Sequence, residues 1–169
     1  MICQLINATH NQAKQINDLV NLAYRSEDGW SNETHLVAGE RSTIEEVHAY
    51  LANPNTYLLV ALEQDKIIAC ICIEQKASDA YIGYFAVHPA YQGYGLGKQV
   101  LFQAEQFARE VFTVDSFVMV VMSQRPELIA YYERRGYKKT GRVLDYPKHL
   151  NVGTPLSNNL TIEYLQKNA

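Results

Sequence analysis

Residues 79–100 read DAYIGYFAVHPAYQGYGLGKQV, and this stretch decides the fold. It opens with an apolar run that predicts a strand over 79–87, followed by a turn with three glycines in the sequence QGYGLG at 92–97. Apolar residues then recur at helical spacing as far as Val111. Such a strand, turn and helix bring backbone N–H groups and the positive end of the helix dipole to one place, where a phosphate can bind.

The segments on either side of this stretch extend the pattern into a sheet. An apolar run at 117–122 predicts a strand after the helix, and a strand–helix–strand crossover makes its two strands parallel. Two further apolar runs, at 56–62 and 66–74, precede the strand at 79–87 across short polar turns. These three runs predict an antiparallel meander.

The rest of the chain supplies shorter elements. Ser42 or Thr43 offers a capping box for a helix that begins at Ile44 and ends before Asn53-Pro54, and the polar segment 25–42 is predicted to be a loop. The other predicted elements are strands over 2–7, 137–143 and 160–167, and helices over 12–24 and 126–135. The fold class is therefore α/β (α+β), with a mixed, mostly antiparallel central sheet of about six to seven strands and about four helices.

Composition and charge exclude several classes of protein. The chain has 169 residues, 47% of them hydrophobic, which suits one domain with a buried core and argues against disorder. The formal charge of −3 is too small to steer the protein toward nucleic acid. The start, MICQLINATH, lacks the regions of a signal peptide, and no apolar run is long enough to span a membrane. We expect one domain over 1–169 that is cytoplasmic and binds neither nucleic acid nor membrane.

The cysteines do not indicate a metal site. Cys70 and Cys72 share one face of a predicted strand, and Cys3 is remote from both in the sequence. An odd total without Cys/His clusters at zinc spacing predicts packed, reduced thiols and no bound metal.

Two familiar phosphate-binding motifs fail at the glycine turn. A Walker A loop needs Gly at the position of Gln92 and Ser or Thr at the position of Gln99. A dinucleotide fingerprint needs a different glycine spacing and an acidic residue that closes the next strand, whereas Asp115 precedes it.

A third pattern fits. The sequence QGYGLG at 92–97 resembles the Q/R-x-x-G-x-G/A pyrophosphate loop of the GNAT superfamily of N-acetyltransferases, and the strand before it, with its exit through His88 and Pro89, is similar to that family's fourth strand. The sequence AYYERRGY at 130–137 resembles the family's A-x-x-F-Y-E-K-x-G-F helix and strand. The order of elements along the whole chain also matches, so the resemblance implies an acyl-CoA N-acyltransferase-like fold.

The resemblance implies acetyl-CoA as the cosubstrate. It assigns backbone pairing with the pantetheine arm to residues 85–87 and pyrophosphate contacts to the loop, to which Gln92 would add a backbone N–H or an amide donor. Lys98 either pairs with a phosphate or is a solvated lysine. The cofactor-binding residues are thus Phe85, Ala86, Val87, Gln92, Gly93, Tyr94, Gly95, Leu96, Gly97 and Lys98.

Tyr132 is the residue that we expect to act in the chemistry. At the matched position the family has a tyrosine used as general acid, and a phenol can give its proton to a leaving thiolate without large tuning of its pKa. For the general base the sequence leaves Glu74 open as an acceptor and Tyr84 as a residue that could orient a water.

The acceptor site is the least specified part. The 25–42 loop should line it, with Trp30 and Arg41 as candidate contacts. Arg125 stands where many family members carry Asn, and it is either a cation near the acceptor or a surface residue at a helix start.

The sequence thus predicts an acetyl-CoA-dependent N-acetyltransferase that acts on a primary amine by direct transfer in a ternary complex. The alternative is a catalytically silent CoA-binding or sensing module of the same fold. The acceptor would be a small-molecule amine or a peptide N-terminus, and the last strand could pair with a second subunit in a homodimer.

Overall fold

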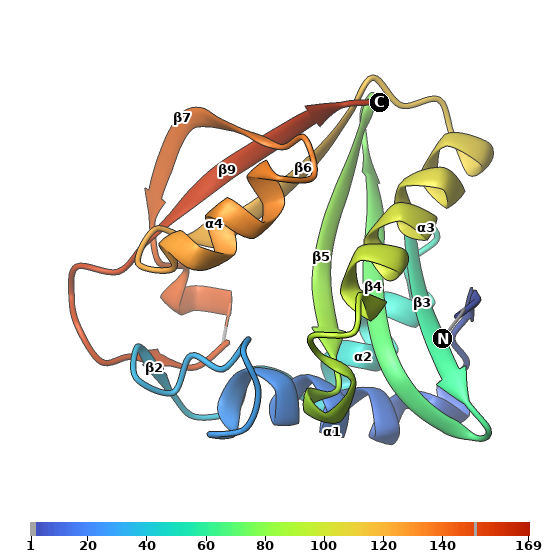
Figure 1. Cartoon of the computed structure of the whole chain (residues 1–169), viewed down its shortest axis with the longest axis horizontal. Coiled ribbons are helices and arrows are strands. Elements are labelled where there is room, and N and C mark those ends of the chain that lie inside the picture. Colours follow the sequence, from blue (N-terminus) through green and yellow to red (C-terminus); the bar gives the residue numbers. More distant parts are fainter. Residues whose placement is uncertain (1–2, 151) are drawn as a thin grey trace.

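The computed structural model describes residues 3–150 and 152–169, so residue 2, where the first predicted strand begins, lies outside the described residues. The described part contains a seven-stranded sheet in the order β1-β3-β4-β5-β6-β9-β7 (Figure 1). Its strands are β1 (Leu5–Asn7), β3 (Thr56–Glu63), β4 (Lys66–Lys76), β5 (Asp79–Val87), β6 (Ser116–Met122), β9 (Thr161–Asn168) and β7 (Lys138–Asp145). The β5–β6 pair is parallel and the other pairs are antiparallel, which confirms the predicted mixed sheet.

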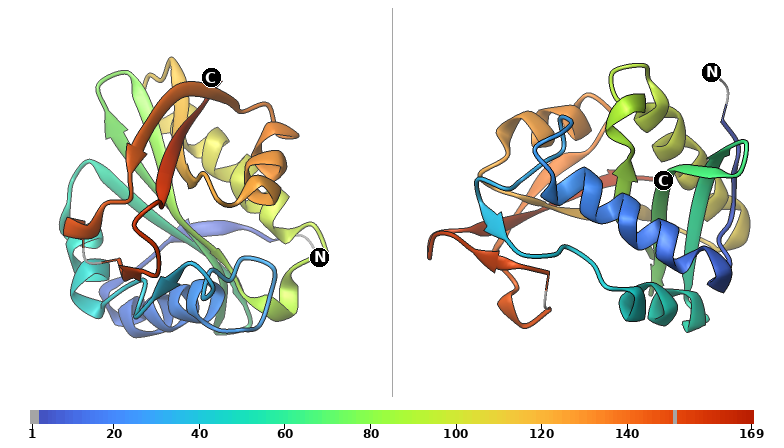
Figure 2. Two further views of the ribbon diagram at one scale, coloured as in Figure 1. Left: turned by 90° about the vertical axis from the view of Figure 1, so that its left-hand side faces the viewer. Right: turned by 90° about the horizontal axis from the view of Figure 1, so that it is seen from below.

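Helices cover both faces of this sheet (Figure 2). They are α1 (Ala13–Arg25), α2 (Ile44–Ala52), α3 (Leu96–Val111) and α4 (Pro126–Glu133). In β4, Cys70 and Cys72 pack with α1 and α2 on one face, whereas Ile71 and Ile73 pack with α3 on the other. Because β4 is buried on both faces, its sequence is a nearly unbroken apolar run rather than an alternating one.

The parallel pair at the centre of the sheet is short. β5 and β6 pair only over Asp79–Tyr81 with Ser116–Val118 and then diverge, as Figure 1 shows. The register of β5 on β4 also shifts between Cys70 and Cys72, opposite Tyr84, whose φ is +49°. A bulge of this kind bends the strand. The edge of β5 beyond Tyr81 is therefore left open toward β6.

Two features differ from the sequence prediction. The predicted loop 25–42 contains β2 (Val37–Ala38), which pairs with β8 (Thr154–Pro155). Two-residue strands so far apart have no local periodicity to reveal them. The expectation that the last strand could pair with a second subunit is wrong, because β9 lies between β6 and β7 and both of its edges are occupied.

The cysteines are packed as expected. Cys3, Cys70 and Cys72 are buried free thiols, and burial raises the pKa of Cys70 to about 12. Among the described residues, no three His, Cys, Asp or Glu side chains are arranged to hold a metal ion. No helix in the described ranges has the length and apolar character needed to cross a membrane.

Candidate functional site

The glycine turn forms an open cradle at the start of α3. Gly93 and Gly95 both have φ of +83°, and a Cβ built on either would meet no atom within 4 Å. The backbone N–H groups of residues 93–98 have no acceptor within the described part of the chain. Lys98 is exposed on the first helical turn beside them. Unpaired N–H groups and the positive end of a helix dipole make this cradle suitable for an anion.

Gln92 makes several hydrogen bonds within the chain. Its Nε2 donates to the Val87 carbonyl at 2.9 Å and to Ser31 Oγ at 3.0 Å, and its Oε1 accepts from the Trp30 N–H at 2.6 Å. Its own backbone N–H donates to Pro89 at 3.2 Å. All of its donors are engaged within the chain, and its contact with a phosphate stays a prediction. Gln92 fastens the 29–31 loop to the end of β5.

Beyond Tyr81, the open edge of β5 directs two N–H groups into the gap between β5 and β6. The Phe85 carbonyl accepts from Tyr24 Oη at 2.5 Å, and the Val87 carbonyl accepts from Gln92. The N–H and C=O of one strand residue point to the same side, so the N–H groups of Phe85 and Val87 also face away from β4. Neither has an acceptor among the described residues.

Ala86 faces the opposite way, contrary to the prediction that it also pairs with the cofactor. Its register partner is Cys70 of β4, and two residues later the N–H of His88 donates to Ile68 of the same strand at 2.9 Å. The alternation along an antiparallel ladder therefore directs the backbone groups of Ala86 into β4.

A cavity of about 880 Å³ lies between α1, α2 and the C-terminal strands. Five predicted residues line it: Glu74, Tyr84, Phe85, Tyr132 and Arg41. Trp30, which we expected at the acceptor, does not. It is 47% exposed, and its ring packs 5.4 Å from that of Tyr131. The exposed position of Trp30 follows from the way Gln92 holds its backbone beside the glycine turn.

Tyr132 is placed on the cavity wall by α4. Its side chain is buried, with rings of Tyr131 and Tyr137 packed edge-on at 5.2 and 6.0 Å. No hydrogen bond from its hydroxyl is found among the described residues. Burial, with smaller contributions from Tyr24 and Tyr131, holds the pKa of Tyr132 well above its ordinary value. The hydroxyl therefore keeps its proton and is available as a donor.

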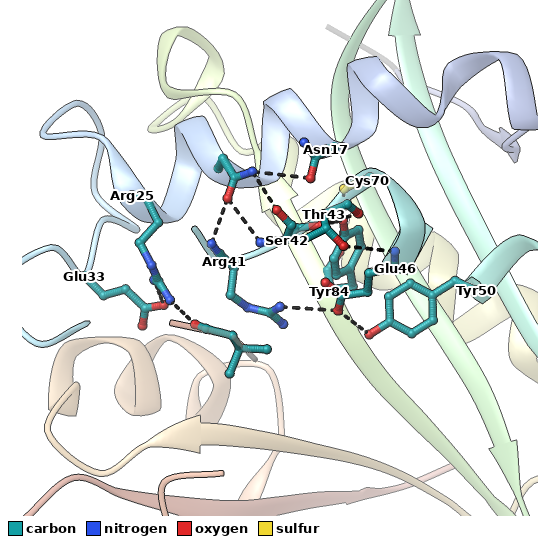
Figure 3. Close-up of polar contacts among 12 residues, drawn as sticks. Asn17, Arg25, Glu33, Arg41, Ser42, Thr43, Glu46, Tyr50, Cys70 and Tyr84 are labelled. Carbon is teal, nitrogen blue, oxygen red and sulfur yellow. Dashed lines mark hydrogen bonds and ion pairs between the residues drawn. The ribbon is translucent and has the colours of Figure 1, made fainter. Parts of the chain in front are cut away.

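The two residues that the sequence offered for the base step, Tyr84 and Glu74, differ in whether their polar groups are already hydrogen-bonded inside the protein. The Tyr84 hydroxyl is hydrogen-bonded to buried Ser42, and its ring packs 5.0 Å from that of Tyr50, so packing rather than water orientation is the role that these contacts give it (Figure 3). Glu74 lines the cavity with a third of its side chain exposed, and its carboxylate is 3.2 Å from Lys76 Nζ.

Residues that sequence reasoning missed complete the cavity. Glu46 accepts a hydrogen bond from Tyr50 Oη at 3.0 Å and lies 3.6 Å from Arg41 Nη1. Asp145 and Tyr146 reach the cavity from the far end of β7. The only sequence signal for Glu46 was its place in a capping box, and no local pattern brings residue 145 to α2.

Arg125 resolves the alternatives that the sequence left open. It is 2% exposed and lines the cavity, so it is not a surface residue. Its guanidinium donates to the carbonyls of Trp30 at 3.2 Å and Ser31 at 3.3 Å, and it pairs with Glu127. Arg125 therefore fixes the 29–31 loop to the start of α4.

Comparisons with known proteins agree with this architecture. The model of the acetyltransferase (GNAT) family matches residues 17–137. A GNAT family acetyltransferase from Elizabethkingia anophelis, solved with acetyl-CoA bound, has a TM-score of 0.72 at 18% identity over 99% of each chain. An N-acetyltransferase from Staphylococcus aureus Mu50 has a TM-score of 0.75 at 15% identity, covering 99% of this chain and 98% of that one. A ribosomal-protein-alanine N-acetyltransferase from Brucella melitensis has a TM-score of 0.70 at 20% identity, covering 98% and 99%. No curated protein sequence matches this chain.

Proposed function

The chain belongs to the acetyltransferase (GNAT) family, and on that premise we propose that it transfers the acetyl group of acetyl-CoA to a primary amine. The observation that carries this proposal is the position of Phe85, between the glycine cradle and the cavity. A Cβ built on Gly97 would lie 3.7 Å from the Phe85 ring, and Phe85 also lines the cavity that contains the Tyr132 hydroxyl. We assign the activity to a single domain over residues 1–169.

The residues around the gap suit a diphosphate attached to an extended amide chain. Acetyl-CoA would supply the acetyl group in activated form, as a thioester. The free N–H groups of residues 93–98 would hold the diphosphate, with Lys98 as an additional cation. The N–H groups of Phe85 and Val87 would donate to the amide chain as a neighbouring strand does, and one of them would stabilise the developing charge on the acyl oxygen.

Tyr132 would act as the general acid. Its hydroxyl gives a proton to the departing sulfur as a new N–C bond replaces the C–S bond, and it recovers a proton from solvent. The attacking amine loses its own proton to Glu74 or to water at the cavity mouth. This role requires a hydroxyl that is protonated and free of other partners, and both conditions describe Tyr132.

The buried thiols favour direct transfer over an acyl-enzyme. The pKa of Cys70 is raised to about 12, and its Sγ lies 3.6 Å from the Tyr84 carbonyl. Burial raises the pKa of Cys72 further. Thiols that keep their protons are poor nucleophiles, so we propose a ternary complex with the amine.

The test combines binding with turnover. Titration calorimetry should detect acetyl-CoA binding, and thiol release should appear with some members of a panel of amino acids, polyamines, aromatic amines and peptide N-termini. Binding without thiol release for any amine would instead identify a catalytically silent CoA-binding module. Failure of acetyl-CoA to bind, with binding of ATP or NAD, would overturn the family-based function as well.

A further inference from the structure

Two arginines, Arg41 and Arg125, line the cavity, and a third, Arg25, pairs with the lining residue Glu33. Arg41 differs from the other two in its hydrogen bonds. Arg25 pairs with Glu33 and donates to the carbonyls of Gly39 and Val152 at 2.8 and 2.5 Å. Arg125 pairs with Glu127 and donates to two carbonyls of the 29–31 loop. In contrast, Nη1 of Arg41 is buried and makes no hydrogen bond within the described residues.

The position of Arg41 is firmly determined by its surroundings. The Asn21 side-chain oxygen accepts hydrogen bonds from the backbone N–H groups of Arg41 and Ser42 at 2.8 and 3.1 Å, which fixes this segment against α1. The guanidinium carbon lies 5.9 Å from the ring centre of Tyr24 and 5.6 Å from that of Tyr84. The side chain therefore stays directed into the cavity rather than toward bulk water.

The ion-pair partner of Arg41, Glu46, does not satisfy its guanidinium. Glu46 Oε1 is 3.6 Å from Nη1, which is too long for a hydrogen bond, and the same oxygen already accepts from Tyr50 Oη at 3.0 Å. A buried guanidinium N–H without an acceptor is unfavourable, because the hydrogen bond to water that it lost on folding is not replaced. An oxyanion in the cavity would remove this cost, and a carboxylate matches the planar fork of a guanidinium best.

We propose that Arg41 binds the carboxylate of the acceptor, so that the amine substrate is an amino acid or a similarly compact amino carboxylate. This inference rests on the proposed acetyl transfer, because it names the substrate class of that same cavity.

The distance between the two functional groups favours a compact acceptor. Arg41 packs against Tyr24, and the Tyr24 hydroxyl donates to the Phe85 carbonyl at 2.5 Å. One tyrosine side chain thus separates the guanidinium from the edge of β5 where the acyl group is to be held. A long polyamine has no anionic group for Arg41 to contact.

The acidic residues of the cavity do not argue for a purely cationic acceptor. Glu33 is paired with Arg25, Glu74 with Lys76, and Glu46 with Tyr50 and Arg41. Asp145 has no ion pair among the described residues, but it lies exposed near the end of β7, at the outer part of the cavity. The glutamates of the cavity are thus already paired, whereas Nη1 of Arg41 has no hydrogen bond within the described residues.

The experiment compares matched acceptors. Each amino acid is assayed by thiol release beside its carboxamide and its decarboxylated amine, with the native protein and with Arg41→Gln, Arg41→Lys and Arg109→Gln. Arg109 is an exposed arginine of α3, on the opposite face of the sheet, and its loss changes net charge equally without touching the cavity. Acetyl-CoA affinity and the melting temperature are measured for every variant.

We expect the native protein to prefer a carboxylate over its carboxamide by roughly 10- to 100-fold in kcat/KM. Arg41→Gln should abolish that preference, mainly through KM, and should leave the acetyl-CoA affinity unchanged; Arg41→Lys should retain part of it. Arg109→Gln should keep it whole.

The outcomes separate this inference from the proposed function. If acetyl-CoA binds and carboxamides or polyamines are turned over as fast as carboxylates, the inference is wrong and the acetyltransferase stands. If no amine is turned over, binding of N-acetyl amino acids to the CoA complex still tests Arg41: weaker binding to Arg41→Gln supports the inference, and equal or absent binding overturns it. If Arg41→Gln does not fold, the carboxylate–carboxamide comparison on the native protein and on Arg41→Lys decides.

Discussion

At the scale of single residues, hydrogen bonding distinguishes the tyrosines of the cavity from one another. Tyr24, Tyr50, Tyr84 and Tyr146 donate to or share a hydrogen bond with another group of the chain. Tyr81 and Tyr164 instead carry Lys76 and Arg142 over their rings at 4.5 and 4.1 Å. Among the described residues the Tyr132 hydroxyl has no such partner, which leaves it available to a bound group.

Replacing Tyr132 with Phe should lower kcat by about 10²- to 10⁴-fold, because the leaving sulfur would lose its proton donor. The ring remains, so the KM for acetyl-CoA should change little. Steady-state thiol release measures both quantities. Tyr57→Phe is the matched control, since that tyrosine packs against Phe107 and Phe112 and is not part of the cavity lining. Equal rates for native protein and Tyr132→Phe would remove Tyr132 from the mechanism.

The raised pKa of Tyr132 also sets the shape of the pH profile. A general acid must be protonated to act, and a group whose pKa lies above the ordinary phenol value of about 10 keeps its proton throughout the usual assay range. We expect kcat/KM to rise as the amine loses its proton and then to stay level up to about pH 9.5. A falling limb between pH 7 and 9 that disappears in Tyr132→Phe would show that the pKa of Tyr132 is not raised.

At the scale of elements, the glycines of the turn before α3 serve two purposes, a left-handed backbone and open space for a ligand, and the sequence motif alone does not show which of the two is required. Gly93 and Gly95 adopt positive φ, which side chains avoid, and the space beside each is empty, which an anion needs. Gly141 on β7 meets the same two conditions, with φ of +84° and no atom within 4 Å, but it is remote from the helix start. Substitutions of Gly95 and Gly141 therefore allow the effect of backbone strain to be distinguished from the effect of a lost ligand contact.

Gly95→Ala and Gly141→Ala should each cost about 1–2 kcal/mol of stability from the left-handed backbone, as urea unfolding would measure. Only Gly95→Ala should also weaken CoA binding, by about tenfold or more in calorimetry, because its methyl group enters the space assigned to the phosphates. Similar CoA affinities for the two variants would show that the cradle does not hold the cofactor.

At the scale of the whole molecule, few contacts join the half built on β5 to the half built on β6. The β5–β6 ladder covers only residues 79–81 of β5, so the open ends of the two strands must be held by other segments. The 29–31 loop does this, because Gln92 fastens it to β5 and Arg125 fastens it to α4. The β2–β8 pair forms a second link farther along.

Arg125→Gln should therefore loosen the open end of the molecule. Two carbonyls lose a charged donor, for which we expect a loss of about 1–3 kcal/mol in unfolding free energy. Hydrogen exchange at residues 29–33 should accelerate more than exchange in the core of β4. Arg134→Gln, at the exposed end of the same helix, should change neither measurement. Unchanged hydrogen exchange in the 29–31 loop of Arg125→Gln would show that the hydrogen bonds from Arg125 do not hold the loop in place.

The sequence by itself determined those features that depend on local pattern. The apolar runs and the glycine turn were sufficient to predict the mixed sheet, the parallel β5–β6 pair and the family, since each rests on periodicity or on a short motif. The position of Arg41 in the polar 25–42 segment likewise suggested a contact with the acceptor, although no pattern showed what it lacks.

Only the tertiary structure decided how the polar groups are shared. Gln92 and Ala86 match the family motif, but the side-chain amide of Gln92 donates to Val87 and Ser31, and the backbone of Ala86 pairs with β4. Trp30 packs against Tyr131 outside the cavity. Hydrogen bonds form between atoms that the fold brings together from distant positions, so a motif cannot tell whether a donor is already occupied. The same reason explains why the free groups, the Tyr132 hydroxyl and Nη1 of Arg41, became visible only when every neighbour had been placed.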